Sequence, residues 1–124
     1  MRTEIDSSLN VQVGGGHYKG LAYQPVSFAV DMDLNFIQGN IVKYVSRYKN
    51  KNGIEDLKKV AHYSQLGIEL NPVNFCPFSR VEERVKLFVM MNNFSDAVGE
   101  IITAACYQDW LRVIAGIRCL YGQE

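Results

Sequence analysis

Residues 35–63 read NFIQGNIVKYVSRYKNKNGIEDLKKVAHY, and this stretch predicts two helices joined by a basic turn. Asn35 is a helix-capping residue type, and Gln38, three positions later, completes a capping-box pattern. Apolar side chains then recur at helical spacing, at Ile37, Ile41, Tyr44, Val45 and Tyr48. The turn KNKNG ends this helix, and Gly53 supplies the backbone freedom that such a turn needs.

The second helix of this stretch begins with two acids, Glu55 and Asp56. Acids in a first turn are favoured by the helix dipole, and Glu55 is placed to pair with Lys59 four residues later. The side chains expected to face the core are Leu57, Val60, Ala61, Ser64 and Ile68. Asn71-Pro72 is expected to end the helix.

Helical patterns continue on both sides of the stretch. Pro25 suits the first position of a short helix, whose inward side chains are expected to be Val26, Phe28, Ala29 and Met32. Ser79 with Glu82 predicts a second capping box, and Ser95 and Asp109 are expected to cap two further helices. The fold class expected is therefore mainly α, a compact bundle of five to six helices with a glycine-rich N-terminal loop.

The 124 residues are expected to form one domain. Residues 1–13 are predicted to be a flexible lead-in, 14–70 the motif region, and 71–124 the C-terminal helical half of the same domain. The apolar fraction of 48% and the charged fraction of 21% are typical of a soluble globular protein. No apolar run approaches the ~20 residues that span a bilayer, and the N-terminus has no apolar block, so neither a membrane contact nor a secretory signal is expected.

The three cysteines, Cys76, Cys106 and Cys119, are widely spaced and odd in number. This pattern favours reduced, buried thiols over a disulfide framework, and it gives no zinc-binding motif. The C-terminal half is rich in apolar residues, notably Trp110, Ile114, Ile117 and the segment 97–105. Such an excess predicts a homo-oligomer.

The charge of the chain is concentrated locally. Thirteen Lys and Arg balance thirteen Asp and Glu overall, but residues 35–63 hold six Lys and Arg against two acids. A local positive field on a neutral protein favours a small anionic ligand, and no nucleic acid polymer is expected as a partner. Asn40, Lys43 and Arg47 share one helix face. A solvated basic surface is the alternative interpretation.

The segment GGGHYKG, residues 14–20, predicts a loop whose backbone can approach a ligand, with His17, Tyr18 and Lys19 beside it. The alternative is a mobile glycine linker. Neither a P-loop nor a dinucleotide-binding glycine pattern is present, and no catalytic set or metal site can be assembled from the spacing, so the catalytic residues stay unknown.

The order of these motifs resembles a known family. The pattern consists of His17 and Tyr18, then Gly39, Asn40, Lys43, Tyr44 and Arg47, then Lys51, then Glu55, Asp56, Leu57, Lys59 and Tyr63. It is similar to a small phage-encoded domain of unknown function that includes a phage nucleotide kinase, and the similarity covers about residues 14–70. His62 stands where the family commonly has tryptophan, and Val60 stands where alanine is usual.

The resemblance implies nucleotide binding in the cytoplasm of a phage-infected bacterium. The expected function is sequestration of a nucleotide, with the cyclic-nucleotide signals of bacterial immunity as one candidate ligand. One alternative is a nucleoside monophosphate kinase, which would need ATP and a divalent cation. Another is an interaction module that docks an acidic partner.

The expected binding site combines the helical face with the glycine loop. Lys43, Arg47 and Lys51 are expected to hold phosphate, with Arg47 the strongest candidate because a guanidinium can bind phosphate oxygens bidentately. Asn40 and Tyr44 would read or stack the base. Asp56 and Glu55 would orient the basic groups or accept a hydrogen bond from a ribose hydroxyl. The full set of expected ligand-binding residues is His17, Tyr18, Lys19, Asn40, Lys43, Tyr44, Arg47, Lys51, Asp56, Lys59 and His62.

Overall fold

The computed structural model describes residues 20–50 and 52–122, and these residues form six α-helices and no strand. The helices are α1 (Pro25–Asp31), α2 (Phe36–Arg47), α3 (Ile54–Leu70), α4 (Val81–Asn92), α5 (Asp96–Cys106) and α6 (Trp110–Tyr121), and the short 3-10 helices are η2 (Tyr48–Asn50) and η3 (Phe78–Arg80). The expected mainly α bundle is therefore confirmed. None of these helices is long and apolar enough to cross a membrane. The expected lead-in and the glycines at 14–16 lie outside the described residues.

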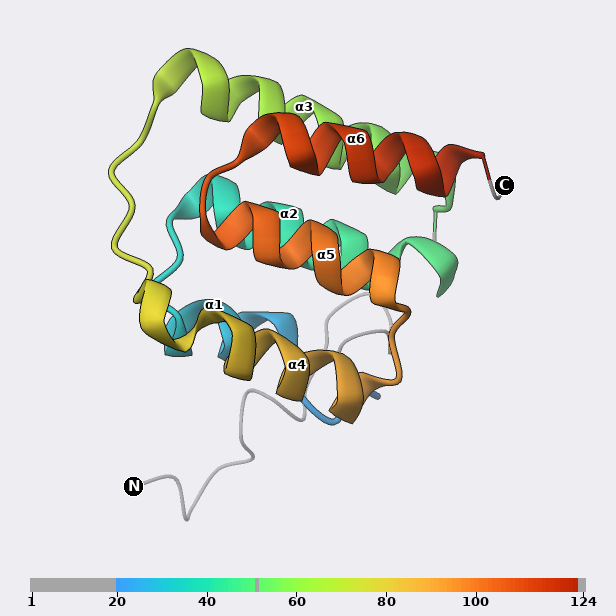
Figure 1. Ribbon diagram of the computed structural model, residues 1–124. Helices are drawn as coiled ribbons and strands as arrows, with labels where there is room; N and C mark the ends of the chain where they lie inside the picture. Colours follow the sequence, from blue (N-terminus) through green and yellow to red (C-terminus); the bar gives the residue numbers. More distant parts are fainter. Residues whose placement is uncertain (1–19, 51, 123–124) are drawn as a thin grey trace, which may run out of the picture.

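The helices form two layers of three, and each half of the chain builds one layer (Figure 1). We call α1, α2 and α3 the first layer, and α4, α5 and α6 the second layer. Within the layers α2 contacts both α1 and α3, and α5 contacts both α4 and α6. Across the layers α2 lies against α5 and α3 against α6. The rings of Phe28 and Phe88, with centroids 4.6 Å apart, join α1 to α4.

The core of the protein is the space between these two layers. Fully buried side chains come from all six helices, and they include Phe28, Ile41, Leu57, Phe88, Ile102 and Ile117. Burial of each such side chain contributes about 1.5–3 kcal/mol, so the contact between layers is the main source of stability.

The turns within the layers explain why consecutive helices fold back on each other. Asp33, Asn93 and Gln108 each adopt a positive φ, at 50°, 57° and 55°. The N–H of the next residue then donates to a carbonyl five positions earlier, in the pairs Leu34 to Ala29, Phe94 to Val89 and Asp109 to Ala104. These left-handed turns end one helix, and the caps Asn35, Ser95 and Asp109 begin the next.

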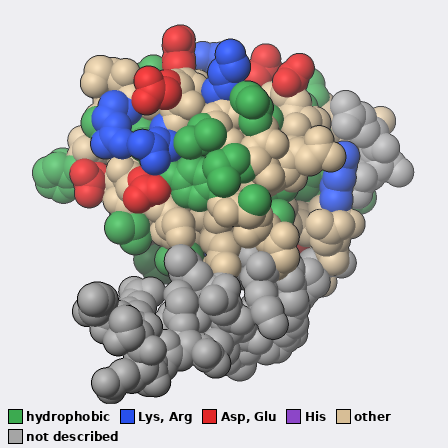
Figure 2. Space-filling model, turned by 90° about the horizontal axis from the view of Figure 1, so that it is seen from below, with side chains coloured by type: hydrophobic (Ala, Val, Ile, Leu, Met, Phe, Trp, Pro, Cys, Tyr) green, Lys and Arg blue, Asp and Glu red, His purple; other side chains and the backbone are tan. Residues whose placement is uncertain are grey.

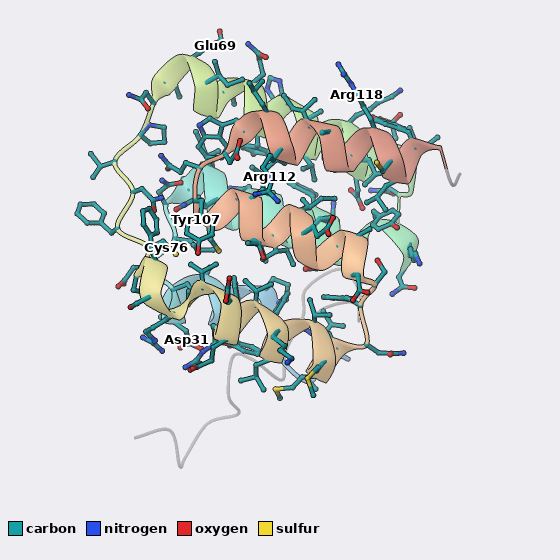
Figure 3. All side chains as sticks on the ribbon, viewed as in Figure 1. Asp31, Glu69, Cys76, Tyr107, Arg112 and Arg118 are labelled. Carbon is teal, nitrogen blue, oxygen red and sulfur yellow. The ribbon has the colours of Figure 1, made fainter. Side chains whose placement is uncertain are left out.

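The segment 71–77 connects the layers, and hydrogen bonds from side chains of both layers hold it in place. The amide nitrogen of Gln38, a fully buried residue, donates to Asn74 Oδ1 and to the carbonyl of Cys106, at 3.0 and 3.1 Å. Asn74 in turn donates to the Cys106 carbonyl at 2.9 Å and accepts from the Cys76 N–H at 3.0 Å. Cys76 thus lies beside the end of α5, where Figure 3 labels it next to Tyr107.

The cysteines are all free thiols, as the sequence predicts. Cys76 and Cys106 are buried, and the hydrogen bond between them, together with burial, raises the pKa of the Cys106 thiol. Cys119 is exposed on α6, so the prediction that it packs in the core is wrong. Its position between the buried Ile117 and Leu120 turns its side chain away from the first layer.

Several local predictions are wrong for identifiable reasons. Val26 is 56% exposed, because the short helix α1 turns Phe28 and Met32 toward the core instead. Ile68 is also exposed, and Gly67 takes the inward position at that end of α3. Ser79 does not cap α4: the chain passes through η3, and the helix begins at Val81 without a side-chain cap.

The apolar residues that predict a homo-oligomer are mostly buried within the single chain. Trp110 and Ile117 are 7% and 1% exposed, Ile114 is half-buried, and most of the apolar side chains in 97–105 are buried against the first layer. The excess of apolar residues in this half is therefore the second face of the core. Self-association stays a prediction, and these residues no longer argue for it.

Candidate functional site

The site predicted from the sequence lies where α2 and α3 pack together. We call Lys43, Tyr44 and Arg47 of α2, with Asp56, Lys59 and Tyr63 of α3, the basic–aromatic face. The turn between the helices fixes their alignment, because Gly53 adopts φ 53° and donates its N–H to the Tyr48 carbonyl at 2.8 Å. Glycine accepts this conformation without steric cost, as the sequence predicts.

Arg47 and Asp56 form the centre of this face. Arg47 Nε donates to Asp56 Oδ2 at 3.2 Å, and Nη2 donates to Oδ1 at 3.1 Å. The Asp56 side chain is completely buried, and that of Arg47 is 10% exposed. Lys59 Nζ lies 3.8 Å from Asp56 Oδ1, so two cations surround the carboxylate. Such a buried, two-point ion pair holds α2 and α3 in one register.

The Glu55–Lys59 pair expected from the sequence does not form. Glu55 pairs instead with Lys58 at 3.5 Å, on the solvent side of α3, where both side chains are exposed. Lys59 is turned toward Asp56 because the buried carboxylate is the stronger partner in a site of low dielectric constant.

The ring of Tyr44 is surrounded by positive charge. The Lys43 and Lys59 Nζ atoms lie 5.0 and 4.9 Å from the ring centroid, and Arg47 Cζ lies 4.6 Å from it. Each distance is within the range of cation–π attraction. The ring of Tyr63 stacks beside that of Tyr44, with centroids 6.0 Å apart and planes inclined by 17°. Three cations and one carboxylate leave a net charge of two positive units around these rings.

Further aromatic and polar groups border the face. Phe36, which is 75% exposed, and the exposed His62 each lie edge-on to the Tyr63 ring, at 6.1 Å. Asn40 donates to the Phe36 carbonyl at 2.8 Å, one turn back along α2. This bond uses one of the amide hydrogens that would otherwise read a base.

The structure therefore brings together the predicted residues of the two helices. Lys43, Tyr44, Arg47, Asp56 and Lys59 form one cluster, and Asn40 and His62 lie at its edge. Four predicted residues lie outside the described part of the chain: His17, Tyr18, Lys19 and Lys51. Within residues 20–50 and 52–122 no group of three or more His, Cys, Asp or Glu side chains is arranged to hold a metal ion.

Tyr63 is a member of the face that the predicted binding set does not include. It belongs to the family-like pattern, and it follows Lys59 by four residues, which places both on the same side of α3. Helical spacing alone was therefore a sufficient signal for Tyr63.

A second polar cluster joins the two layers at α1 and α4. The Tyr23 hydroxyl donates to Asp31 Oδ2 at 2.5 Å, and Arg84 Nη1 lies 3.4 Å from that hydroxyl and 3.6 Å from Asp31. Burial, followed by the hydrogen bond to Asp31, raises the pKa of Tyr23 above its ordinary value. Asn92 exchanges two hydrogen bonds with the Tyr23 backbone, at 2.9 and 2.7 Å. No sequence signal indicated this cluster, since its members lie far apart in the chain.

The end of the bundle formed by α1 and α4 differs from the basic–aromatic face. Figure 2 shows hydrophobic side chains gathered there with both basic and acidic groups around them. The exposed apolar residues of these two helices are Val26, Val30, Leu87, Met90 and Met91. Mixed charge gives this end no preference for an anion, so the basic–aromatic face is the better candidate site.

Comparison with known families agrees with part of the expected resemblance. Residues 14–65 match a family described as proteins of unknown function, DUF3310. The match covers α1, α2 and most of α3, so it includes the described residues of the basic–aromatic face and stops before the second layer. No curated protein and no solved structure matches the chain.

Proposed function

We propose that this protein binds a nucleotide on the basic–aromatic face and retains it without chemical change. The observation that carries the proposal is the Tyr44 ring with three cationic groups within 5.0 Å of its centroid. A nucleotide combines a flat aromatic base with negatively charged phosphate. Aromatic rings stack on bases regardless of sequence, and lysine and arginine side chains bind phosphate.

Helices α2 and α3 each contribute an aromatic ring and a lysine to the proposed site. Tyr44 and Tyr63 offer the stacking surface, and Lys43 and Lys59 provide the ammonium groups nearest to it. Arg47 uses two of its three guanidinium nitrogens on Asp56. Its main role in the proposal is to hold the two helices together and to add positive charge, and its direct contact with phosphate stays a prediction.

The state of Asp56 favours retention over phosphoryl transfer. A kinase commonly uses a carboxylate to accept the proton of the attacking hydroxyl, within hydrogen-bond reach of the substrate. Asp56 is completely buried and is bound by Arg47 and Lys59, so its oxygens face the protein. A carboxylate in this state is suited to orienting cations.

The resemblance to phage-encoded domains suggests which nucleotides to test first. The cyclic-nucleotide signals of bacterial immunity are anionic, carry bases and occur in the host cytoplasm. A phage protein that retained such a signal would act against host defence.

The experiment is to incubate the protein with a panel of linear and cyclic nucleotides and Mg²⁺, remove unbound ligand, heat-denature the protein, and identify what is released by mass spectrometry. Intact nucleotide in the released fraction is the expected result. A product one phosphate heavier than the supplied nucleotide would identify a kinase. If nothing is retained and nothing is converted, the face is a solvated surface or a docking site for an acidic partner, and the proposal is wrong.

A further inference from the structure

Two of the three cysteines, Cys76 and Cys106, lie against each other although they are far apart in the chain. Asn74 holds their backbones together, because its Oδ1 accepts from the Cys76 N–H at 3.0 Å and its Nδ2 donates to the Cys106 carbonyl at 2.9 Å. The buried Gln38 donates to the same carbonyl at 3.1 Å. The two side chains share a hydrogen bond, thiol to thiol. A network of hydrogen bonds therefore fixes the two thiols in contact.

The two thiols are not equivalent. The hydrogen bond from the Cys106 thiol lowers the pKa of Cys76, while burial and the nearby Asp33 carboxylate oppose this change. The same hydrogen bond, followed by burial, raises the pKa of Cys106. The thiolate is the nucleophilic form of cysteine. Cys76 is therefore the thiol that reacts first, and Cys106 stays protonated beside it.

The position of each thiol in the fold agrees with this order. Cys76 is 6% exposed and lies on the non-helical segment 71–77, next to Phe75, which is 73% exposed. Cys106 is completely buried in the last turn of α5. Segments without helical hydrogen bonds open locally more easily than the core does. A local opening of the segment would thus expose Cys76 to a small oxidant while Cys106 stays covered.

We propose that Cys76 and Cys106 form a redox-active dithiol, which hydrogen peroxide oxidises to a disulfide. The Cys76 thiolate attacks one oxygen of the peroxide, the O–O bond breaks, and hydroxide leaves and takes a proton from solvent, so that Cys76 becomes a sulfenic acid. The Cys106 sulfur then attacks the Cys76 sulfur. The S–S bond forms, the S–O bond breaks, and the Cys106 proton leaves with the oxygen as water. Two electrons pass from the dithiol to the peroxide, and a thiol reductant reverses the oxidation.

The disulfide would fasten the segment between the layers to the end of α5. Hydrogen bonds hold this segment in the reduced protein, and a covalent bond would close residues 76–106, with η3, α4 and α5, into one loop. Closing such a loop restricts the unfolded chain, so the oxidised protein is expected to be more stable than the reduced protein. Neither cysteine belongs to the basic–aromatic face, so this inference does not depend on the proposed nucleotide binding.

The test uses the full chain with Cys119→Ser, because the exposed Cys119 would otherwise join two molecules. The folded, reduced protein is treated with a small molar excess of hydrogen peroxide, its remaining thiols are alkylated, and its peptides are mapped by mass spectrometry. The expected product is a pair of peptides linked through Cys76 and Cys106, which dithiothreitol separates. The unfolding midpoint in urea should rise on oxidation and return to its first value on reduction.

Cys106→Ser and Cys76→Ser, each made in the same background, are the matched controls. Cys106→Ser is expected to stop at the sulfenic acid of Cys76, which dimedone traps, and Cys76→Ser should stay unmodified at Cys106. If the linked peptides do not form in the folded Cys119→Ser protein, the inference is wrong, whatever the other variants do. Equally fast linkage in the urea-unfolded chain, or a lower urea midpoint after oxidation, would also overturn it. Faster oxidation of Cys106 in Cys76→Ser than of Cys76 in Cys106→Ser would overturn the assigned order.

Discussion

The backbone of Gly67 in α3 lies directly against the indole ring of Trp110 in α6. A Cβ atom added at Gly67 would come within 2.4 Å of Trp110 Cε2 and 2.7 Å of two further ring atoms. Trp110 is 7% exposed and is fixed at the first position of α6, after the cap at Asp109. This contact lets α3 and α6 approach closely, and it shows why the inward position belongs to Gly67 and not to its neighbour Ile68.

Gly67→Ala is therefore expected to destabilise the protein even though alanine is the better helix former. Overpacking of a well-filled core costs about 1–3 kcal/mol, more than the gain in helix propensity. Gly39→Ala is the matched control, because its Cβ would meet the nearest atom, Ala29 Cβ, at 3.8 Å, an ordinary contact. Urea denaturation should show a loss for Gly67→Ala and no loss for Gly39→Ala, and equal effects would contradict the packing argument.

Arg47→Ala is expected to lower the free energy of unfolding by about 3–5 kcal/mol, because it leaves the buried Asp56 carboxylate without its main partner. Lys58→Ala removes an exposed ion pair with Glu55 and should stay within about 0.5 kcal/mol of the wild type. The denaturant midpoints of the two variants, each compared with that of the wild type, measure these losses of stability. An unfolding midpoint of Arg47→Ala equal to that of the wild type would mean that the ion pair does not stabilise the packing of α2 against α3.

Binding of nucleotide is expected to depend on the Tyr44 ring. Tyr44→Leu removes a stacking surface worth about 1–3 kcal/mol per base, so affinity should fall roughly tenfold or more. Tyr107→Leu is the control, since Tyr107 is exposed at the end of α5 and pairs with Phe78, not with the basic–aromatic face. Isothermal titration calorimetry with the nucleotide identified by mass spectrometry gives both affinities. Unchanged affinity in Tyr44→Leu would place the ligand elsewhere.

The charge of the face should appear in the salt dependence of binding. Lys43→Ala and Lys59→Ala are each expected to weaken nucleotide binding at low salt and to reduce the sensitivity of the affinity to salt, because each removes a cation beside the Tyr44 ring. Lys86→Ala on α4 should leave both quantities as they are in the wild type. If the affinity of the wild type does not change with salt, its ligand is not held by phosphate contacts.

Alkaline pH is expected to destabilise the protein through Tyr23. Because the folded-state pKa of Tyr23 is raised, the folded protein holds this proton more tightly than the unfolded chain, whose tyrosine pKa is about 10. The resulting stability is fully present below pH ~10 and is lost as the pH rises through the folded-state pKa. Tyr23→Phe should show a shallower decline of the unfolding free energy above pH ~10. Parallel pH curves for the two proteins would contradict this assignment.

The helices were predictable because their boundaries are set by neighbouring residues. The capping box of Asn35 and Gln38 forms as expected, since both partners lie within one turn. Ser79 shows the limit of such patterns: its capping box with Glu82 does not form, because a 3-10 turn after Pro77 delays the start of α4 by one residue.

Most members of the basic–aromatic face were predictable from the sequence, but the pairing among them was not. Spacing along α2 placed Lys43 and Arg47 together, but it could not show that Arg47 is already bound to Asp56. That pair depends on the conformation of the intervening turn, which folds Asn52 and Gly53 so that α3 starts beside the end of α2.

The arrangement of one layer per half of the chain makes the segment 71–77 a tether. Its length keeps the two halves at a high effective concentration, so their association is intramolecular. A cut within this segment would leave two fragments that each present one face of the core. Folding would then become a bimolecular reaction, and the unfolding midpoint of the nicked protein would rise with its concentration.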